Sequence, residues 1–351
     1  MYTNKTTKRV YVGSVAIGGG APVSIQSMLA VPAHDIEGNV AAAKELEKAG
    51  CEILRVSVPD KEAVKTLEKL KESVNIPIVA DIHFNWRLAV LSAQAGADKI
   101  RINPGNIGDE QGVLEVVKAC KQRNIPIRIG VNSGSLEKNI LAKYGKVTPE
   151  ALVESGLYHI KMLEKHDFDD IVLSLKSSDV KVMYDAYVLA CESIKYPLHL
   201  GVTEAGTENV GVIKSSAGIG GLLLRDIGDT IRISLTDDPV KEVKAAQKLL
   251  NAVGLRRSGI QFISCPTCGR TEIDLIGIAN KVGEKLSGVN KNITVAVMGC
   301  VVNGPGEAAA ADIGIAGGRK CGVLFKKGQI ISNKIPEDKL VETLVSEIEK
   351  M

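Results

Sequence analysis

Residues 77–103 read PIVADIHFNWRLAVLSAQAGADKIRIN, and they contain the unit that repeats through most of the chain. A short β-branched run ends in polar residues, and a longer stretch with helical periodicity then leads to the next run. Such runs lie at residues 23–28, 52–58, 77–82, 99–102, 126–131, 170–175, 197–202 and 220–224. Eight strands that alternate with helices predict an α/β fold, a (β/α)8 barrel of the TIM type.

A second, smaller domain is predicted where this rhythm ends. Residues 238–253 form a last amphipathic helix, and residues 254–259 contain two arginines and a serine typical of a boundary. We therefore expect a substrate-binding barrel at 1–254 and a compact α/β domain at 255–351. Its expected strands are 260–264, 293–298 and 312–315, with a hairpin at 322–332 and helices at 272–286 and 336–350. A longer interval at 136–159 predicts an extra helix over the barrel mouth.

Composition excludes several classes of protein. The 351 residues include 44 Lys and Arg against 41 Asp and Glu, a net charge of +3 that is too small to indicate binding to nucleic acid or to a membrane surface. The basic N-terminal residues precede no long apolar run, so neither a signal peptide nor a membrane span is expected. We expect a cytoplasmic protein. Seven cysteines argue against a disulfide framework and favour use of some thiols as ligands.

Charged and amide side chains follow or end most of the predicted barrel strands, where the active sites of such barrels lie. These residues are Arg55, Asp81, His83, Arg101, Asn103, Arg128, Asn132, Lys176, Glu204, Arg232 and Ser234. Arginine within a strand is costly unless an anion or a carboxylate pairs with it. Guanidinium groups suit phosphate oxygens, so the pattern predicts a diphosphate ligand, with ion pairs inside the barrel wall as the alternative. Glu204 among these cations suggests a proton donor or an ion-pair partner.

Three cysteines near the end of the chain form a candidate metal site. Cys265 and Cys268 make a C-x2-C turn after one predicted strand, and Cys300 ends the next, seven residues before Glu307. A structural zinc site takes four Cys or His ligands, but no histidine follows residue 200. Three thiolates completed by a carboxylate favour a redox iron–sulfur cluster, because a harder and more exchangeable ligand leaves one iron accessible to a substrate oxygen.

The motifs ISCPTCGRT, VMGCVVNGPGEA, VADIHF and IRINPGNIG resemble those of the 4-hydroxy-3-methylbut-2-enyl diphosphate synthase family, in its bacterial two-domain form. The resemblance covers essentially the whole chain. It implies a barrel followed by a domain similar to the cluster-binding part of sulfite and nitrite reductases. It also implies one 4Fe-4S cluster per subunit, held by Cys265, Cys268, Cys300 and Glu307. The family forms a head-to-tail homodimer in which the cluster of one subunit covers the barrel of the other.

The implied activity is an iron–sulfur oxidoreductase of isoprenoid precursor synthesis in the methylerythritol phosphate pathway. It converts 2-C-methyl-D-erythritol 2,4-cyclodiphosphate to (E)-4-hydroxy-3-methylbut-2-enyl diphosphate, with electrons from flavodoxin or ferredoxin. By resemblance, the diphosphate contacts are Arg55, Arg101, Arg128, Lys176, Arg232 and Ser234, and the carbon skeleton contacts are Asp81, Asn103 and Asn132. The expected catalytic pair is Glu307, which yields its iron to a substrate oxygen, and Glu204, which protonates the departing hydroxyl.

The sequence is also compatible with two other kinds of protein. One is a zinc-stapled barrel transferase that acts on a phosphorylated small molecule without redox chemistry. The other is a non-enzymatic cluster carrier or redox-sensing module, which has no need of the cations at the strand ends.

Overall fold

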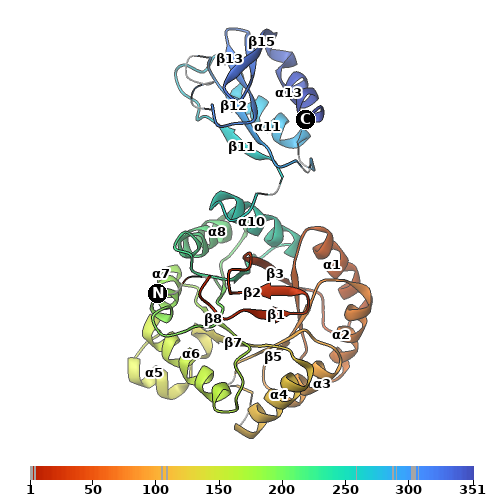
Figure 1. Ribbon diagram of the computed structural model, residues 1–351, viewed down its shortest axis with the longest axis vertical. Coiled ribbons are helices and arrows are strands. Elements are labelled where there is room, and N and C mark those ends of the chain that lie inside the picture. The colour runs from red at the N-terminus through yellow and green to blue at the C-terminus, as the bar shows by residue number, and fades with distance from the viewer. Residues whose placement is uncertain are drawn as a thin grey trace. The chain divides into compact units, whose positions relative to one another are not determined.

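The structure is a computed structural model that describes residues 3, 5–103, 106–107, 110–257, 259–286, 288–289, 291–301, 306 and 308–351. The chain divides into two compact units, Met1–Leu255 and Arg256–Met351. Each unit has its own hydrophobic core, and Figure 1 shows the helices and strands of both.

Parallel strands of the first unit form a closed barrel. Hydrogen bonds join them in the order β8-β7-β6-β5-β4-β3-β10-β9, and a parallel bridge between Leu173 of β8 and Leu198 beside β9 joins the two ends. The predicted (β/α)8 barrel is therefore confirmed. Its strands are β3 (Ser24–Met28), β4 (Ile53–Ser57), β5 (Ile78–Ile82), β6 (Lys99–Ile102), β7 (Ile127–Asn132), β8 (Ile171–Lys176), β9 (His199–Leu200) and β10 (Thr230–Ile231).

The eighth strand lies later in the chain than the sequence pattern indicates. The run at 220–224 was expected to be a strand, but α8 (Glu208–Ser215), a π-helical turn (Ser216–Gly220) and α9 (Gly221–Leu223) make this segment helical. A methyl group on Gly218 would come within 2.5 Å of Met183, so the segment packs closely against α7 (Val180–Ala190). A short apolar run fits a buried helix as well as a strand, and tertiary packing decides between them.

Helices surround the barrel, and capping side chains fix where several of them begin (Figure 1). Asp35, Thr148 and Asp238 each accept a hydrogen bond from a backbone N–H of the first turn. Besides those named above, the outer helices are α1 (Ile36–Lys48), α2 (Glu62–Ser73), α3 (Trp86–Gln94), α4 (Glu110–Arg123), α6 (Pro149–Glu164) and α10 (Pro239–Ala252).

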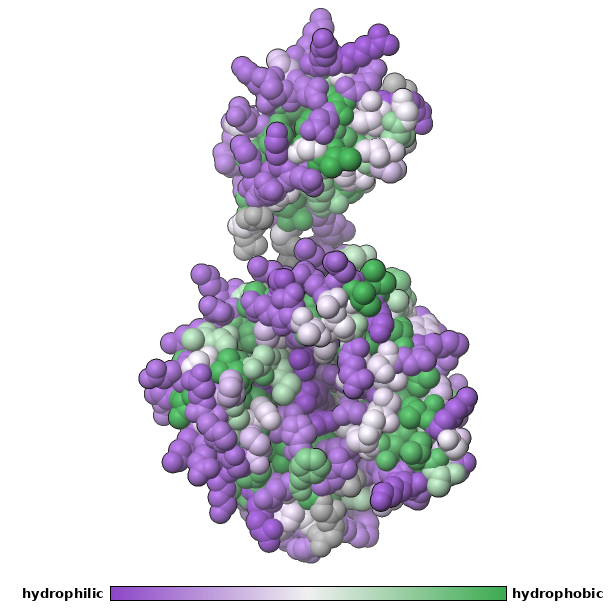
Figure 2. All heavy atoms as spheres, turned by 180° about the vertical axis from the view of Figure 1, so that it is seen from behind, coloured by the Kyte–Doolittle hydropathy of each residue, from purple (hydrophilic) through white to green (hydrophobic). Residues whose placement is uncertain are grey.

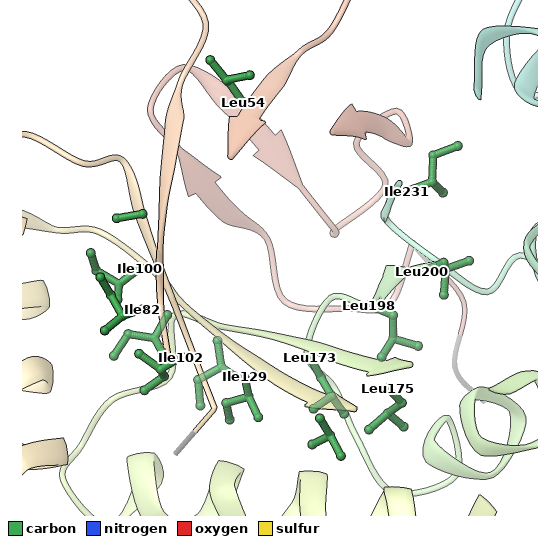
Figure 3. Packing of buried hydrophobic residues seen from close by; sticks show 14 of the residues in the cluster. Leu54, Ile82, Ile100, Ile102, Ile129, Leu173, Leu175, Leu198, Leu200 and Ile231 are labelled. Carbon is green, nitrogen blue, oxygen red and sulfur yellow. The ribbon is translucent and has the colours of Figure 1, made fainter. Parts of the chain in front are cut away.

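The core of this unit lies between the strands and the helices. Alternate strand residues such as Leu54, Ile100 and Leu173 are buried and point from the barrel toward the helices (Figure 3). Because successive strand residues face opposite sides, the residues between them point into the barrel. Those inward positions carry the charged side chains.

A hairpin covers the amino ends of the barrel strands. Its strands β1 (Val10–Val12) and β2 (Val15–Ile17) cross the barrel in Figure 1. Val12 and Ile17 are buried against Ile53 and Val79, which lie near the amino ends of β4 and β5. The hairpin thus closes one end, and the carboxyl ends of the strands face the other.

The extra helix predicted at 136–159 is present as α5 (Lys138–Tyr144), but it does not lie over the barrel mouth. It is at the periphery of the ring in Figure 1. Lys143 and Tyr144 both bind Glu154 of α6, at 2.6 and 2.7 Å. These contacts hold α5 against the outer surface of α6.

The second unit contains a five-stranded mixed sheet in sequential order. Strands β11 to β13 are parallel, and β14 and β15 continue the sheet antiparallel. Helices α11 (Leu275–Lys285) and α13 (Leu340–Glu349) pack on it through residues such as Ile278 and Leu344. The strands are β11 (Gln261–Ser264), β12 (Thr294–Met298), β13 (Ile313–Gly318), β14 (Cys321–Lys326) and β15 (Gln329–Pro336).

None of the helices in the described part of the chain is long and apolar enough to cross a bilayer.

Candidate active site

A polar cavity opens at the carboxyl ends of the barrel strands. Hydrophilic side chains surround a hollow on the face opposite the hairpin (Figure 2). The cavity has a volume of about 140 Å³. Its lining residues are Arg55, Arg101, Arg128, Gly130, Asn132, Ser174, Lys176, Thr203, Arg232 and Ser234.

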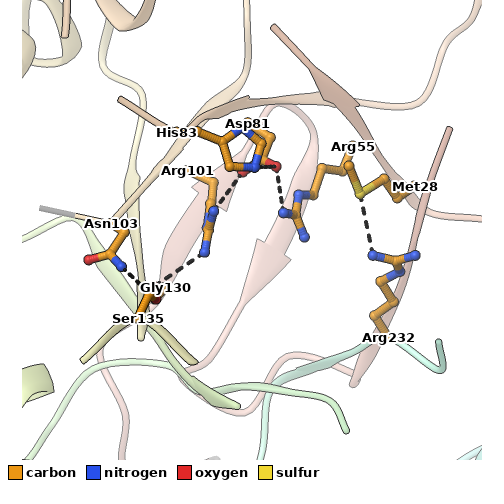
Figure 4. A network of polar contacts seen from close by, with 9 residues as sticks. All are labelled: Met28, Arg55, Asp81, His83, Arg101, Asn103, Gly130, Ser135 and Arg232. Atoms are coloured by element: carbon orange, nitrogen blue, oxygen red, sulfur yellow. Dashed lines mark hydrogen bonds and ion pairs between the residues drawn. The ribbon is translucent and has the colours of Figure 1, made fainter. Parts of the chain in front are cut away.

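Asp81 lies between two of the arginines and is fully buried (Figure 4). Its carboxylate is 2.6 Å from Arg55 Nη2 and 3.1 Å from Arg101 Nη1, and His83 Nε2 is 3.4 Å away. Burial alone would raise the pKa of Asp81, but the two guanidinium groups outweigh burial and hold that pKa well below its usual range. Asp81 is therefore a carboxylate, and it neutralises only one of its two arginine partners.

Arg232 has a different carboxylate partner. Glu242 of α10 accepts from Arg232 Nε at 3.3 Å, and it also accepts from the Ser27 hydroxyl at 3.1 Å and from the Leu235 N–H at 3.0 Å. The remaining guanidinium nitrogen Nη1 contacts the Met28 sulfur at 3.4 Å (Figure 4). Arg232 is therefore ion-paired inside the barrel wall, which is the alternative to phosphate binding that the sequence left open.

Arg128 and Lys176 carry the charges that these carboxylates do not neutralise. Arg128 is 1% exposed, and its Nε and Nη1 atoms have no hydrogen-bond partner among the described residues. Burial, followed by repulsion from the neighbouring cations, lowers the pKa of both side chains well below their usual values. An anion in the cavity would relieve this repulsion and satisfy the free donors.

Two glycines make room for these cations, and the sequence analysis missed them. A methyl group on Gly130 would lie 2.4 Å from Arg101 Nε, and one on Gly201 would lie 2.9 Å from Lys176 Nζ. Both glycines occupy inward positions, so the lack of a side chain lets a cation lie across the barrel wall. Inward alternation along the predicted strands was the pattern that could have identified them.

The sequence analysis also missed a polar layer deeper in the barrel. Lys99 lies two residues before Arg101 on β6 and is fully buried, with no hydrogen-bond partner for Nζ among the described residues. Burial, together with the charge of Arg128, lowers the pKa of Lys99 well below its usual value. Neither ring nitrogen of the buried His199 has a partner in the same set.

Of the remaining predicted barrel residues, some lie at or near the cavity and one does not line it. Asn103 is buried and donates to the Ser135 hydroxyl at 3.1 Å (Figure 4). Asn132 and Ser234 line the cavity, whereas Glu204 is exposed and is absent from the lining. The backbone of Glu204 has φ of +52°, a left-handed conformation that is uncommon for a residue other than glycine.

In the second unit, two of the three cysteines follow adjacent parallel strands. Ser264 of β11 is paired with Val297 of β12, so Cys265 and Cys300 emerge at the same edge of the sheet. The Gly299 N–H donates to Cys265 Sγ at 3.1 Å, which places the two loops side by side. Cys268 is exposed, and the N–H of Arg270 holds its pKa below the usual value.

The donor set of this unit, three thiols with no histidine in the unit's sequence, is of the type that iron–sulfur clusters take. A tetrahedral zinc with Zn–S bonds of about 2.3 Å brings its sulfur ligands to about 3.8 Å from each other. In the described part of the second unit, no three Cys, His, Asp or Glu ligand atoms lie within 4.8 Å of one another. The N–H of Arg270 also favours the thiolate form of Cys268, and thiolates are the ligands of iron–sulfur clusters. The predicted fourth ligand, Glu307, lies outside the described residues.

Fold and site together define a class of protein, a TIM-type barrel with an anion-binding mouth followed by a small α/β unit that presents three thiols. Two family models match, described as the GcpE TIM-barrel domain over residues 7–247 and the GcpE protein C-terminal domain over residues 261–350. The chain belongs to the GcpE family.

Curated relatives match nearly the full length. A protein of Clostridium perfringens is 57% identical over 98% of this chain and 99% of its own. One of Caldanaerobacter subterraneus subsp. tengcongensis is 56% identical over 99% of this chain and 98% of its own. Both are named 4-hydroxy-3-methylbut-2-en-1-yl diphosphate synthase (flavodoxin).

Among solved structures, a Yersinia pestis dihydropteroate synthase superposes with a TM-score of 0.52 at 12% identity, over 71% of this chain and all of its own. At that identity the match supports the barrel fold alone.

Proposed function

We infer that this chain is an oxidoreductase that reduces 2-C-methyl-D-erythritol 2,4-cyclodiphosphate to (E)-4-hydroxy-3-methylbut-2-enyl diphosphate. The observation that carries this conclusion is the buried set of cations at the barrel mouth, where Arg128 has free donors that an anion would satisfy. Full-length relatives at more than 55% identity bear the name of this synthase and of flavodoxin. Flavodoxin is therefore the electron donor that we assign. These names do not favour the zinc-stapled transferase.

The cations of the mouth bind the diphosphate. Arg128 and Lys176 supply charge that no carboxylate neutralises, Arg55 and Arg101 share a single carboxylate, and Ser234 adds a hydroxyl. Charge-assisted hydrogen bonds of this kind are stronger than neutral ones. They are in place before the substrate enters, so they also stabilise the phosphate as it becomes a leaving group when the ring opens.

The polar groups beside these cations orient the carbon skeleton. Asp81 is fixed by two arginines, and Asn103 is held by Ser135. Asn132 lines the cavity from the end of β7. Glu204 is the proton donor for the departing hydroxyl, and its position on an exposed loop after β9 gives it access to solvent protons.

We assign the cluster to Cys265, Cys268, Cys300 and Glu307, one 4Fe-4S group per subunit, in a domain similar to the cluster-binding part of sulfite and nitrite reductases. When bound, the cluster supplies electrons one at a time, which side chains do not. The overall reaction consumes two electrons and two protons and releases water. Glu307, a carboxylate among thiolates, would hold its iron as a harder and more exchangeable ligand than the three cysteines.

A homodimer completes the site in this proposal. The barrel of one subunit and the cluster domain of the other form the active site together. This arrangement follows from the family resemblance, as does a cytoplasmic location. Mixing Arg128→Met chains with Cys268→Ser chains tests this arrangement. In a heterodimer, the intact barrel of one chain meets the intact cluster domain of the other, so one of the two sites is restored. Each heterodimer should then have about half of the activity of a wild-type dimer. No recovery on mixing contradicts the shared site.

The cluster assignment has its own test. Anaerobically purified protein is assayed for iron and acid-labile sulfide, and Cys268→Ser is expected to lose both, together with turnover. The variant should still bind inorganic diphosphate, since its barrel is unchanged. Unchanged iron, sulfide and turnover in Cys268→Ser would show that this thiol holds no cluster.

A further inference from the structure

A short segment after β7 connects the barrel mouth to the outer helix α6. It contains a 3-10 turn (Ser133–Ser135), Leu136, and Glu137, which is the residue before α5. Asn132 precedes the turn and lines the cavity. The conformation of this segment therefore sets the position of groups at the mouth.

The inner end of the segment holds a buried amide in place. Asn103 Nδ2 donates to Ser135 Oγ at 3.1 Å, and the Ser135 hydroxyl is 3.5 Å from the Asn132 carbonyl oxygen (Figure 4). Asn103 is 4% exposed, so this contact is shielded from water. A displacement of Ser135 would shift Asn103 and Asn132 together.

The outer end of the segment is fixed by a polar contact between a buried histidine and a half-buried carboxylate. His159 of α6 is 1% exposed, and its Nε2 atom contacts Glu137 Oε1. Burial alone would raise the pKa of Glu137, but the His159 ring, the Glu137 backbone N–H and the Ser155 hydroxyl outweigh it and lower that pKa. The Glu137 carboxylate is thus docked on α6, whose Ser155 and His159 lie one turn apart.

Burial of ionisable side chains costs free energy of folding, so the contact between Glu137 and His159 suggests a role in positioning rather than in stability. Burying an ionisable pair away from water seldom adds stability, but it does fix geometry. α5 has other contacts with α6, through Lys143 and Glu154 at its carboxyl end. The contact of Glu137 with His159 lies at the amino end of α5, two residues from Ser135.

We propose that His159 is a positioning residue for the reaction at the barrel mouth and acts through Glu137, Ser135 and Asn103. This inference rests on the proposed function. His159 lies on the outer helix α6 and is not among the residues that line the mouth. Its removal should therefore misplace the groups that orient the carbon skeleton and leave the diphosphate contacts intact.

The test compares His159→Leu with His159→Gln, whose amide can still donate to Glu137. We expect kcat of His159→Leu to fall about 10- to 100-fold, because misplacement of about 1 Å costs up to 10²-fold. KM and the affinity for inorganic diphosphate should change less than threefold. The glutamine variant should keep at least a third of kcat, and Tyr158→Phe, an exposed neighbour on α6, should match the wild type.

Ser135→Ala keeps the proposal open to refutation if His159→Leu fails to fold, since it removes the next contact without altering the core. A kcat reduced several-fold with unchanged diphosphate affinity would support the proposal. Full kcat in Ser135→Ala, or in a folded His159→Leu, would overturn it. So would a loss of diphosphate affinity equal to the loss of kcat. Absence of turnover in the wild type would instead refute the proposed function.

Discussion

Replacing Arg128 by methionine should stabilise the free protein and weaken its binding of diphosphate. The guanidinium is 1% exposed, two of its nitrogens have no partner among the described residues, and cations surround it. Exchanging buried charges for apolar side chains of similar volume typically stabilises by about 1–4 kcal/mol. For a unit of this size that corresponds to a rise in Tm of roughly 2–16 °C.

The same change removes a charge-assisted contact to the ligand. Such hydrogen bonds contribute about 1.5–3 kcal/mol, so the Kd for inorganic diphosphate should rise about 10- to 150-fold. Thermal unfolding followed by circular dichroism gives the first quantity, and isothermal titration calorimetry gives the second. The opposite signs of the two effects distinguish a ligand-binding arginine from a structural one.

Arg101→Met is the matched control. Arg101 contacts the buried Asp81, so its loss leaves that carboxylate with less neutralising charge. The free protein should then be destabilised, in contrast to Arg128→Met. If Arg128→Met lowers Tm and keeps the wild-type affinity for diphosphate, the reasoning about uncompensated charge is wrong.

Three further predictions concern other residues of the barrel. Gly130→Ala should displace the Arg101 guanidinium, which lies 2.4 Å from the new methyl group, and weaken diphosphate binding about 10-fold by calorimetry. Gly134→Ala, with no atom within 4 Å, is its control and should bind normally. The pKa of Lys99 is lowered in the folded state, so the unfolded chain binds a proton that the folded chain does not. Stability to urea should therefore rise with pH, by up to about 1.4 kcal/mol per unit, between the folded pKa and the unfolded value near 10.4. Lys99→Met should have a smaller slope at pH values below the unfolded pKa, and an unchanged slope would mean that Lys99 is not its source. Glu204→Gln should bind diphosphate normally but turn over about 10²- to 10⁴-fold more slowly, and full turnover would exclude a proton-donor role.

The barrel was predictable because its pattern is local. Strands such as β5 and β6 alternate with helices, and each strand is a buried β-branched run that can be recognised without tertiary information. Prediction failed at 220–224, where the apolar run packs against α7 and the true strand Thr230–Ile231 is only two residues long. Ile231 and Ile233 alternate there with Arg232 and Ser234, and this alternation was the pattern that could have identified the strand.

The types of residue at the site were predictable from the sequence, but the contacts between them were not. Polar residues at strand ends indicated the barrel mouth, and adjacent parallel strands explain why Cys265 and Cys300 lie at one sheet edge. The partner of Arg232 could not be inferred, since Glu242 lies on a helix that the fold brings beneath the barrel wall. The space provided by Gly130 likewise depends on where the Arg101 side chain crosses the barrel.

The most direct measurement is anaerobic turnover of 2-C-methyl-D-erythritol 2,4-cyclodiphosphate by the purified protein with reduced flavodoxin. Product is followed by phosphorus NMR, which separates the cyclic from the open-chain diphosphate. We predict stoichiometric formation of (E)-4-hydroxy-3-methylbut-2-enyl diphosphate, with two electrons consumed per product and loss of activity in Arg128→Met. A protein that contains iron and sulfide and binds the cyclodiphosphate, but forms no product with reduced flavodoxin, would contradict the account.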